Sequence, residues 1–174
     1  MTGKRLLGIL LAGCFVFAAV LAAGETEEQE AAVWTEANRA TGTLAQSGDF
    51  EAAFKNAQKV LGQARTLWGL KHPNTAKAMN NLANLYVQAG ELDLAEELYQ
   101  KTLAIERTQP NLQEQAAGSY FNLAMIRKAQ GDLEAAAHFL SQAKMALGSG
   151  KSSSDLDSTR IDRELAALAH VKRS

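Results

Sequence analysis

Cysteine and proline are nearly absent from this chain of 174 residues. The single cysteine, Cys14, lies in an apolar N-terminal segment, so the rest of the chain has no disulfide to form. The two prolines, Pro73 and Pro110, fall between the helices that we expect, where a missing backbone N–H costs least. Aromatic residues make up only 6% of a chain that is 47% apolar. Much of the apolar content is alanine, which favours closely packed helices over sheets.

The chain also lacks a charge excess and a recognisable catalytic set. Its net charge is −1 and it has no basic run, so nothing in the sequence points to nucleic-acid binding. The three histidines, His72, His138 and His170, have no neighbouring nucleophile and no metal-spaced partner. We therefore expect a protein that is not an enzyme and has no metal or cofactor, and we interpret His72 as a turn residue.

Residues 1–24 have the layout of a bacterial export signal. Lys4 and Arg5 precede an apolar run over residues 6–23, and an acidic stretch follows over residues 25–31. We expect that stretch to be a flexible spacer. The apolar run predicts a protein that is exported to the periplasm or attached to a membrane.

Three fates of this segment remain open. The stretch that ends at Cys14 resembles a lipobox, in which the cysteine receives lipid and becomes the mature N-terminus. Cleavage after Ala22, Ala23 or Gly24 would instead release a soluble protein. Without cleavage, an apolar run of about 18 residues is near the lower limit for spanning a bilayer.

The organising stretch of the remaining chain is residues 72–107. Its first half places Ala78, Leu82, Ala83 and Tyr86 on one helical face, where steps of three and four residues connect them. Gly90 interrupts the pattern, because glycine accepts the left-handed geometry of a tight turn between helices. The apolar pattern then resumes at Leu92, so the stretch predicts an antiparallel helical hairpin.

This hairpin recurs along the sequence. A shift of 41 residues takes Asn81-Leu82-Ala83 to Asn122-Leu123-Ala124, and a shift of 42 takes Gly48 to Gly90. Such a period predicts a solenoid, because one hairpin cannot bury both of its faces. We expect repeats at about 32–69, 73–108 and 111–147, and a C-terminal capping helix at about 156–171.

The repeat resembles the tetratricopeptide repeat (TPR) family, and its spacing and sequence resemble the kinesin-light-chain variety most. The residues that carry the resemblance in the second and third repeats are Leu82, Ala83, Tyr86, Gly90, Leu92, Ala95 and Tyr99, and Leu123, Ala124, Gly131, Leu133, Ala136 and Ala143. The first repeat departs from the pattern at Ala40, Thr41 and Leu44. The resemblance implies an all-α fold, a right-handed α-solenoid of three hairpins and a capping helix, which acts as a binding scaffold.

Candidate binding residues are the positions of each first helix that packing does not use, since these would line a concave groove. They are Lys77, Asn80, Asn81, Asn84 and Gln88 in the second repeat, Phe121, Asn122, Met125 and Lys128 in the third, and Asn38 and Arg39 in the first. Asparagine offers both a donor and an acceptor to the backbone of an extended peptide. In the family, asparagines at this place often hold the main chain of a ligand. Phe121 and Met125 suggest an apolar subsite.

Two other interpretations of these asparagines remain open: a solvated helix face, or side chains that tie neighbouring helices together. The family's clamp for a C-terminal carboxylate is not expected, because Gly118 and Asn122 occupy two of its basic positions. Trp34 and Trp68 fit packing at helix ends better than stacking on a ligand.

The sequence thus predicts a non-catalytic adaptor of the bacterial envelope that binds a peptide or helix of an unidentified protein partner in its groove. One alternative is a homo-oligomeric scaffold that stacks through its end faces. Another is an accessory subunit of an enzyme or secretion complex that docks by its convex face.

Overall fold

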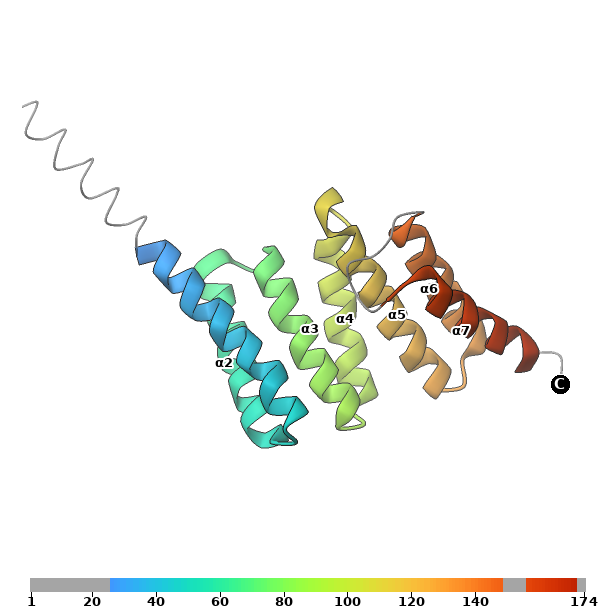
Figure 1. Cartoon of the computed structure of the whole chain (residues 1–174), viewed down its shortest axis with the longest axis horizontal. Coiled ribbons are helices and arrows are strands. Elements are labelled where there is room, and N and C mark those ends of the chain that lie inside the picture. Colours follow the sequence, from blue (N-terminus) through green and yellow to red (C-terminus); the bar gives the residue numbers. More distant parts are fainter. Residues whose placement is uncertain (1–25, 149–155, 172–174) are drawn as a thin grey trace, which may run out of the picture.

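The computed structural model describes residues 26–148 and 156–171, and within them every regular element is a helix. The helices stand side by side in chain order along the long axis of the molecule (Figure 1). They are the N-terminal helix (residues 26–46), α2 (Phe50–Trp68), α3 (Pro73–Gln88), α4 (Leu92–Glu106), the short 3₁₀ helix η1 (Pro110–Leu112), α5 (Gln113–Ala129), α6 (Leu133–Leu147) and α7 (Ser158–Val171). The chain is therefore an α-solenoid of three helical hairpins followed by a single helix, as its repeats predict.

The turn inside each hairpin has the same geometry in all three repeats. Gly48, Gly90 and Gly131 have φ values of 84°, 80° and 83°, in the region that side chains disfavour. In the second repeat, the N–H of Glu91 donates to the carbonyl of Tyr86 at 2.9 Å, which closes the end of α3. The turns that the glycines predict are confirmed.

Residues 26–31 differ from the expectation of a flexible spacer, because they are helical and continuous with the rest of the N-terminal helix. Glutamate, glutamine and alanine are good helix formers. The acidic residues of this stretch are therefore part of the helix and do not form a separate spacer.

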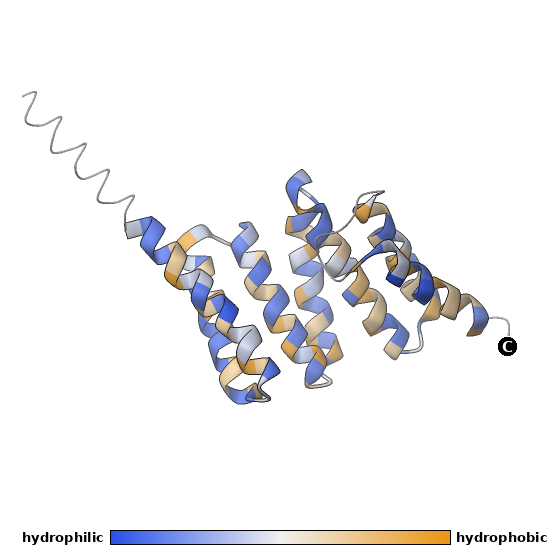
Figure 2. Cartoon of the chain, in the orientation of Figure 1, coloured by the Kyte–Doolittle hydropathy of each residue, from blue (hydrophilic) through white to orange (hydrophobic). Residues whose placement is uncertain are grey.

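Small and branched apolar residues fill the core between the hairpins. Each helix carries both polar and apolar residues (Figure 2). Buried apolar residues of neighbouring helices pack together in shared clusters. Leu123 of α5 and Leu140 of α6 are completely buried. Ile161 and Leu168 of α7 are buried against the third hairpin, so α7 covers the end of the core. No helix among the described residues has the length and apolarity that crossing a membrane requires.

The second and third hairpins also meet through a buried carboxyl group. Glu106 at the end of α4 is 3% exposed, and the Ser119 hydroxyl of α5 donates to its Oε2 at 2.7 Å. Burial raises the pKa of Glu106, and the hydrogen bond from Ser119 opposes that shift. No ion pair joins this carboxylate to a cation of the described residues.

The Glu106→Gln variant is expected to be more stable than the wild type at neutral pH. Because burial raises the folded-state pKa of Glu106, the neutral acid stabilises the fold fully below the unfolded pKa of about 4.3. That contribution is lost as the pH rises through the folded pKa. Glutamine keeps an acceptor for Ser119 and carries no charge. Removing the cost of a buried charge, roughly 1 kcal/mol, would raise the melting temperature by about 2–4 °C near pH 7.5.

Thermal unfolding of both proteins at about pH 7.5 and pH 4 checks this expectation. The advantage of the variant should shrink towards pH 4, and an equal difference at the two pH values would contradict it. Glu134→Gln, at an exposed position of α6, is the matched control and should change stability by less than about 0.5 kcal/mol.

Candidate peptide-binding groove

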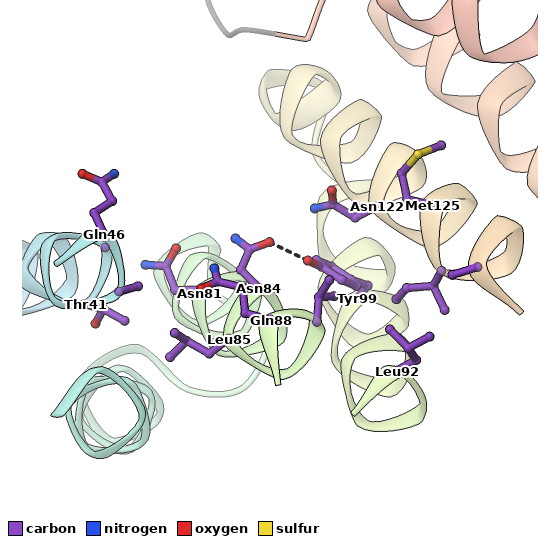
Figure 3. A pocket seen from close by; sticks show the side chains of 15 residues that line it. Thr41, Gln46, Asn81, Asn84, Leu85, Gln88, Leu92, Tyr99, Asn122 and Met125 are labelled. Atoms are coloured by element: carbon purple, nitrogen blue, oxygen red, sulfur yellow. Dashed lines mark hydrogen bonds between the residues drawn. The ribbon is translucent and has the colours of Figure 1, made fainter. Parts of the chain in front are cut away.

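A groove runs along the first helices of the three hairpins and contains a cavity of about 520 Å³ (Figure 3). No charged side chain is among its lining residues. They are Thr41, Gly42, Ala45 and Gln46 of the N-terminal helix, Asn81, Asn84, Leu85, Val87 and Gln88 of α3, Leu92 and Tyr99 of α4, and Asn122, Met125, Ile126 and Ala129 of α5. The cavity therefore has an amide-bearing wall and an apolar floor.

Hydrogen bonds within the protein fix two of the three asparagines that line the cavity. Asn81 Nδ2 donates to Asn38 Oδ1 at 3.0 Å, which joins the first and second repeats. The Tyr99 hydroxyl donates to Asn84 Oδ1 at 2.5 Å, as the dashed line in Figure 3 shows. These bonds leave Asn81 Oδ1 as an acceptor and Asn84 Nδ2 as a donor for a ligand. Asn122 makes no hydrogen bond to a described residue, so its whole amide is available.

Tyr99 supports this arrangement from the second helix of its hairpin. Its side chain is 1% exposed, and burial raises the pKa of its hydroxyl well above the usual value for tyrosine. The hydroxyl therefore keeps its proton and remains a donor to Asn84 at any physiological pH. An aromatic ring that packing holds still is a rigid support for the amide above it.

The structure separates the candidate binding residues into two groups. Asn81, Asn84, Gln88, Asn122 and Met125 line one cavity. The others do not line it: they are Lys77, Asn80, Phe121, Lys128, Asn38 and Arg39.

The second group has contacts of its own. Phe121 is 6% exposed in the core, where the Arg160 guanidinium of α7 lies 4.7 Å from its ring centre. Asn38 is 4% exposed and binds Asn81, so neither Phe121 nor Asn38 is available to a groove ligand. The suggested apolar subsite thus keeps Met125 and loses Phe121.

The charged residues of that group lie outside the cavity. Lys128 Nζ lies 2.7 Å from Glu164 Oε2 of α7, and Arg39 pairs with Glu36 on the exposed surface. Lys77 is exposed and makes no ion pair with a described residue. Asn80 Oδ1 is buried and accepts no hydrogen bond from the described residues.

Sequence reasoning missed the apolar floor. Leu92 and Tyr99 belong to α4, a second helix, and they reach the cavity because the first helices stand apart above them. Small residues at Gly42, Ala45 and Ala129 leave that space open. A run of small residues at groove positions, with a large apolar residue on the following helix, is the signal that could have revealed it.

His72 and the two tryptophans have structural roles. His72 Nδ1 accepts from the N–H of Asn74 at 3.1 Å and so caps α3, while its ring stacks on Trp68. Trp34 is 2% exposed and meets Trp68 edge to face, which confirms packing. Among the described residues, no three histidine, cysteine or carboxylate side chains gather closely enough to hold a metal ion.

Several solved structures share this fold. The kinesin light chain TPR-like repeats of Podosopora anserina superpose with a TM-score of 0.67 at 19% identity, over 79% of this chain and 66% of that one. The type III secretion chaperone SycD of Yersinia enterocolitica, in complex with a peptide of the translocator YopD, gives 0.61 at 21% identity, over 79% and 93%. BtubC (BKLC) from P. vanneervenii gives 0.60 at 24% identity, over 72% and 53%. At these identities the likeness shows the fold alone.

A more similar sequence belongs to a much larger protein. The clustered mitochondria protein homolog of Emericella nidulans is 31% identical over an alignment of 130 residues, and the match covers 67% of this chain. This chain spans only 10% of the length of that relative, so the match concerns one region of it.

Sequence profiles of the tetratricopeptide repeat match most of the described solenoid. One covers residues 34–108, which are the first two hairpins, and another covers residues 117–146 of the third. Each profile includes the glycine turns of the hairpins that it covers. The chain belongs to the tetratricopeptide repeat family.

Proposed function

We propose that this protein is a non-catalytic interaction scaffold that binds an extended, locally uncharged segment of a partner protein in its groove. The observation that carries the proposal is a cavity of about 520 Å³ lined by amides and apolar groups with no charged side chain. A charged side chain that entered it would lose water without gaining a counter-ion, which is costly. A peptide main chain, by contrast, has the N–H and C=O groups that match the free acceptor of Asn81 and the free donor of Asn84.

The family and one neighbour support this proposal. The SycD structure contains a peptide of its translocator, so a related solenoid accommodates a peptide of a partner protein. In the present chain the apolar floor at Leu85, Leu92 and Ile126 would take one or two uncharged side chains of the segment. The amides would hold its backbone with little regard to sequence, and the floor would supply the selectivity.

Filling the groove from one side tests the proposal without removing any existing contact. A Cβ added at Gly42 meets no atom within 4 Å, so Gly42→Phe projects a ring into the cavity while favouring the helix. Gly62→Phe is the matched control, since Gly62 is equally open but lies in α2 outside the groove. Peptides selected from a random display library on the Gly62→Phe protein should bind Gly42→Phe at least about tenfold more weakly, a loss of about 1.4 kcal/mol.

The same peptides should bind Gly62→Phe as tightly as the wild type, and their shared core should be poor in charged residues. Peptides that bind Gly42→Phe with wild-type affinity would contradict the groove as the site. A selected core dominated by aspartate, glutamate, lysine or arginine would contradict its uncharged character.

We further propose that the scaffold works in a bacterial envelope, because residues 1–24 have the layout of an export signal. That segment lies outside the described residues. The mass of the mature protein purified from its native envelope distinguishes the three fates: a lipid-modified start at Cys14, a start after residues 22–24, or an intact N-terminus. Detection only in the cytosolic fraction would contradict export.

A further inference from the structure

A second cleft opens on the side of α3 opposite the groove, between α2 and α4. Met79, Leu82 and Tyr86 of α3 form its floor, and at 100° per residue they point away from Asn81 and Asn84. The cleft consists of two cavities of about 330 Å³ and about 470 Å³. Arg65 of α2 lines both, so the two cavities are neighbours, and together they are called here the α2–α4 cleft.

Exposed leucines mark the two ends of the α2–α4 cleft. Leu94 near the start of α4 is 44% exposed, and Leu70 after the end of α2 is 66% exposed. From Leu94 to Thr108, the last lining residue after α4, a helix rises roughly 20 Å, which is the length of a partner helix of about four turns. A groove between two helices with an apolar floor is a surface into which a third helix packs.

The rim of this cleft is basic and largely unneutralised. Arg65 and Lys71 line it, and neither makes an ion pair with a carboxylate of the described residues. Lys101 on the other wall is already paired with Glu97. A complementary partner therefore carries carboxylates.

The same arrangement recurs one repeat later. Arg107 stands 42 residues after Arg65, the spacing that also relates Gly48 to Gly90. It lines a cavity of about 310 Å³ between α4, α5 and α6, next to Met145, which is 74% exposed. Arg107 also makes no ion pair with a described residue. An arginine without an ion-pair partner, in a cavity that an exposed apolar residue also lines, thus recurs in two neighbouring repeats.

We propose that the α2–α4 cleft docks an amphipathic helix of a partner protein, with an apolar stripe on the floor and carboxylates against Arg65 and Lys71. This surface is separate from the groove, so one molecule can hold two partners at once. The groove selects an uncharged extended segment, whereas the α2–α4 cleft selects an acidic helix.

A pair of synthetic helical peptides tests the charge preference. Each has about 16 residues, enough to span roughly 24 Å, with leucine at helical spacing. One carries glutamate beside the leucine stripe and its twin carries lysine at the same positions. With the full-length protein, the acidic peptide should bind at least about tenfold more tightly than its twin, by fluorescence polarisation at low salt.

Three variants test the place. Arg65→Glu and Gly62→Phe, both at exposed positions of α2, should each weaken binding of the acidic peptide about tenfold, while Gly42→Phe should leave it unchanged. Equal binding of the two peptides, no binding of the acidic one, or loss of binding in Gly42→Phe alone would overturn the proposal. The cleft could instead bind a second copy of this chain, and sedimentation of the wild type and of Arg65→Glu tests this alternative. Self-association of the wild type that Arg65→Glu abolishes would assign the cleft to a second copy.

Discussion

The Trp34→Ala variant is expected to lose about 3–5 kcal/mol of stability in the first repeat and to melt roughly 10 °C lower. Trp34 is 2% exposed, its indole Nε1 donates to the carbonyl of Val60 at 2.9 Å, and its ring centre lies 4.9 Å from that of Trp68. Alanine removes one of the two tryptophan rings that pack between the N-terminal helix and α2, and leaves a cavity that the two helices cannot close fully. Circular dichroism during thermal unfolding measures the change.

Two further variants separate the contributions to this loss. Trp34→Phe keeps most of the ring and loses the hydrogen bond, so it should lose much less stability than Trp34→Ala. Val33→Ala, at a neighbouring position that is 66% exposed, should change stability by less than about 0.5 kcal/mol. An unchanged melting temperature in Trp34→Ala would mean that Trp34 does not hold the first repeat together.

The architecture could be predicted from the sequence because the repeat determines local and long-range structure together. A glycine at position 48, 90 or 131 fixes a turn by its backbone freedom, whatever surrounds it. Each copy then supports the boundaries of the next, which is why α3 begins at Pro73 as expected. The stretch over residues 26–31 has no counterpart among the repeats, and its composition fits both a spacer and a helix.

The binding positions were harder to predict because one step along a helix turns a side chain by 100°. Asn80 and Phe121 each precede a groove asparagine by one residue, and both face neighbouring helices instead of the cavity. Whether such a position is open depends on the element that packs over it, and for Phe121 that element is α7. Periodicity in one helix carries no information about the helix that covers it.

Because α7 covers Phe121, a substitution in α7 is expected to cost about as much stability as Trp34→Ala, at the other end of the solenoid. Ile161→Asp should detach α7 and lower the stability of the third hairpin by roughly 3–5 kcal/mol, because a carboxylate cannot be buried without a partner. Ile161 is completely buried against the third hairpin together with Leu168. Detachment of α7 would expose Phe121 and separate Lys128 from Glu164.

Because each repeat of a solenoid contacts only its neighbours, this damage should stay local. Hydrogen exchange should show α5, α6 and α7 losing protection while α2 and α3 keep theirs. Arg163→Asp introduces the same side chain at an exposed position of α7 and should leave the exchange pattern unchanged. A uniform loss of protection would mean that the three hairpins unfold as one unit. No loss at all would mean that α7 does not hold the third hairpin closed, and that Phe121 needs no cover to remain in the core.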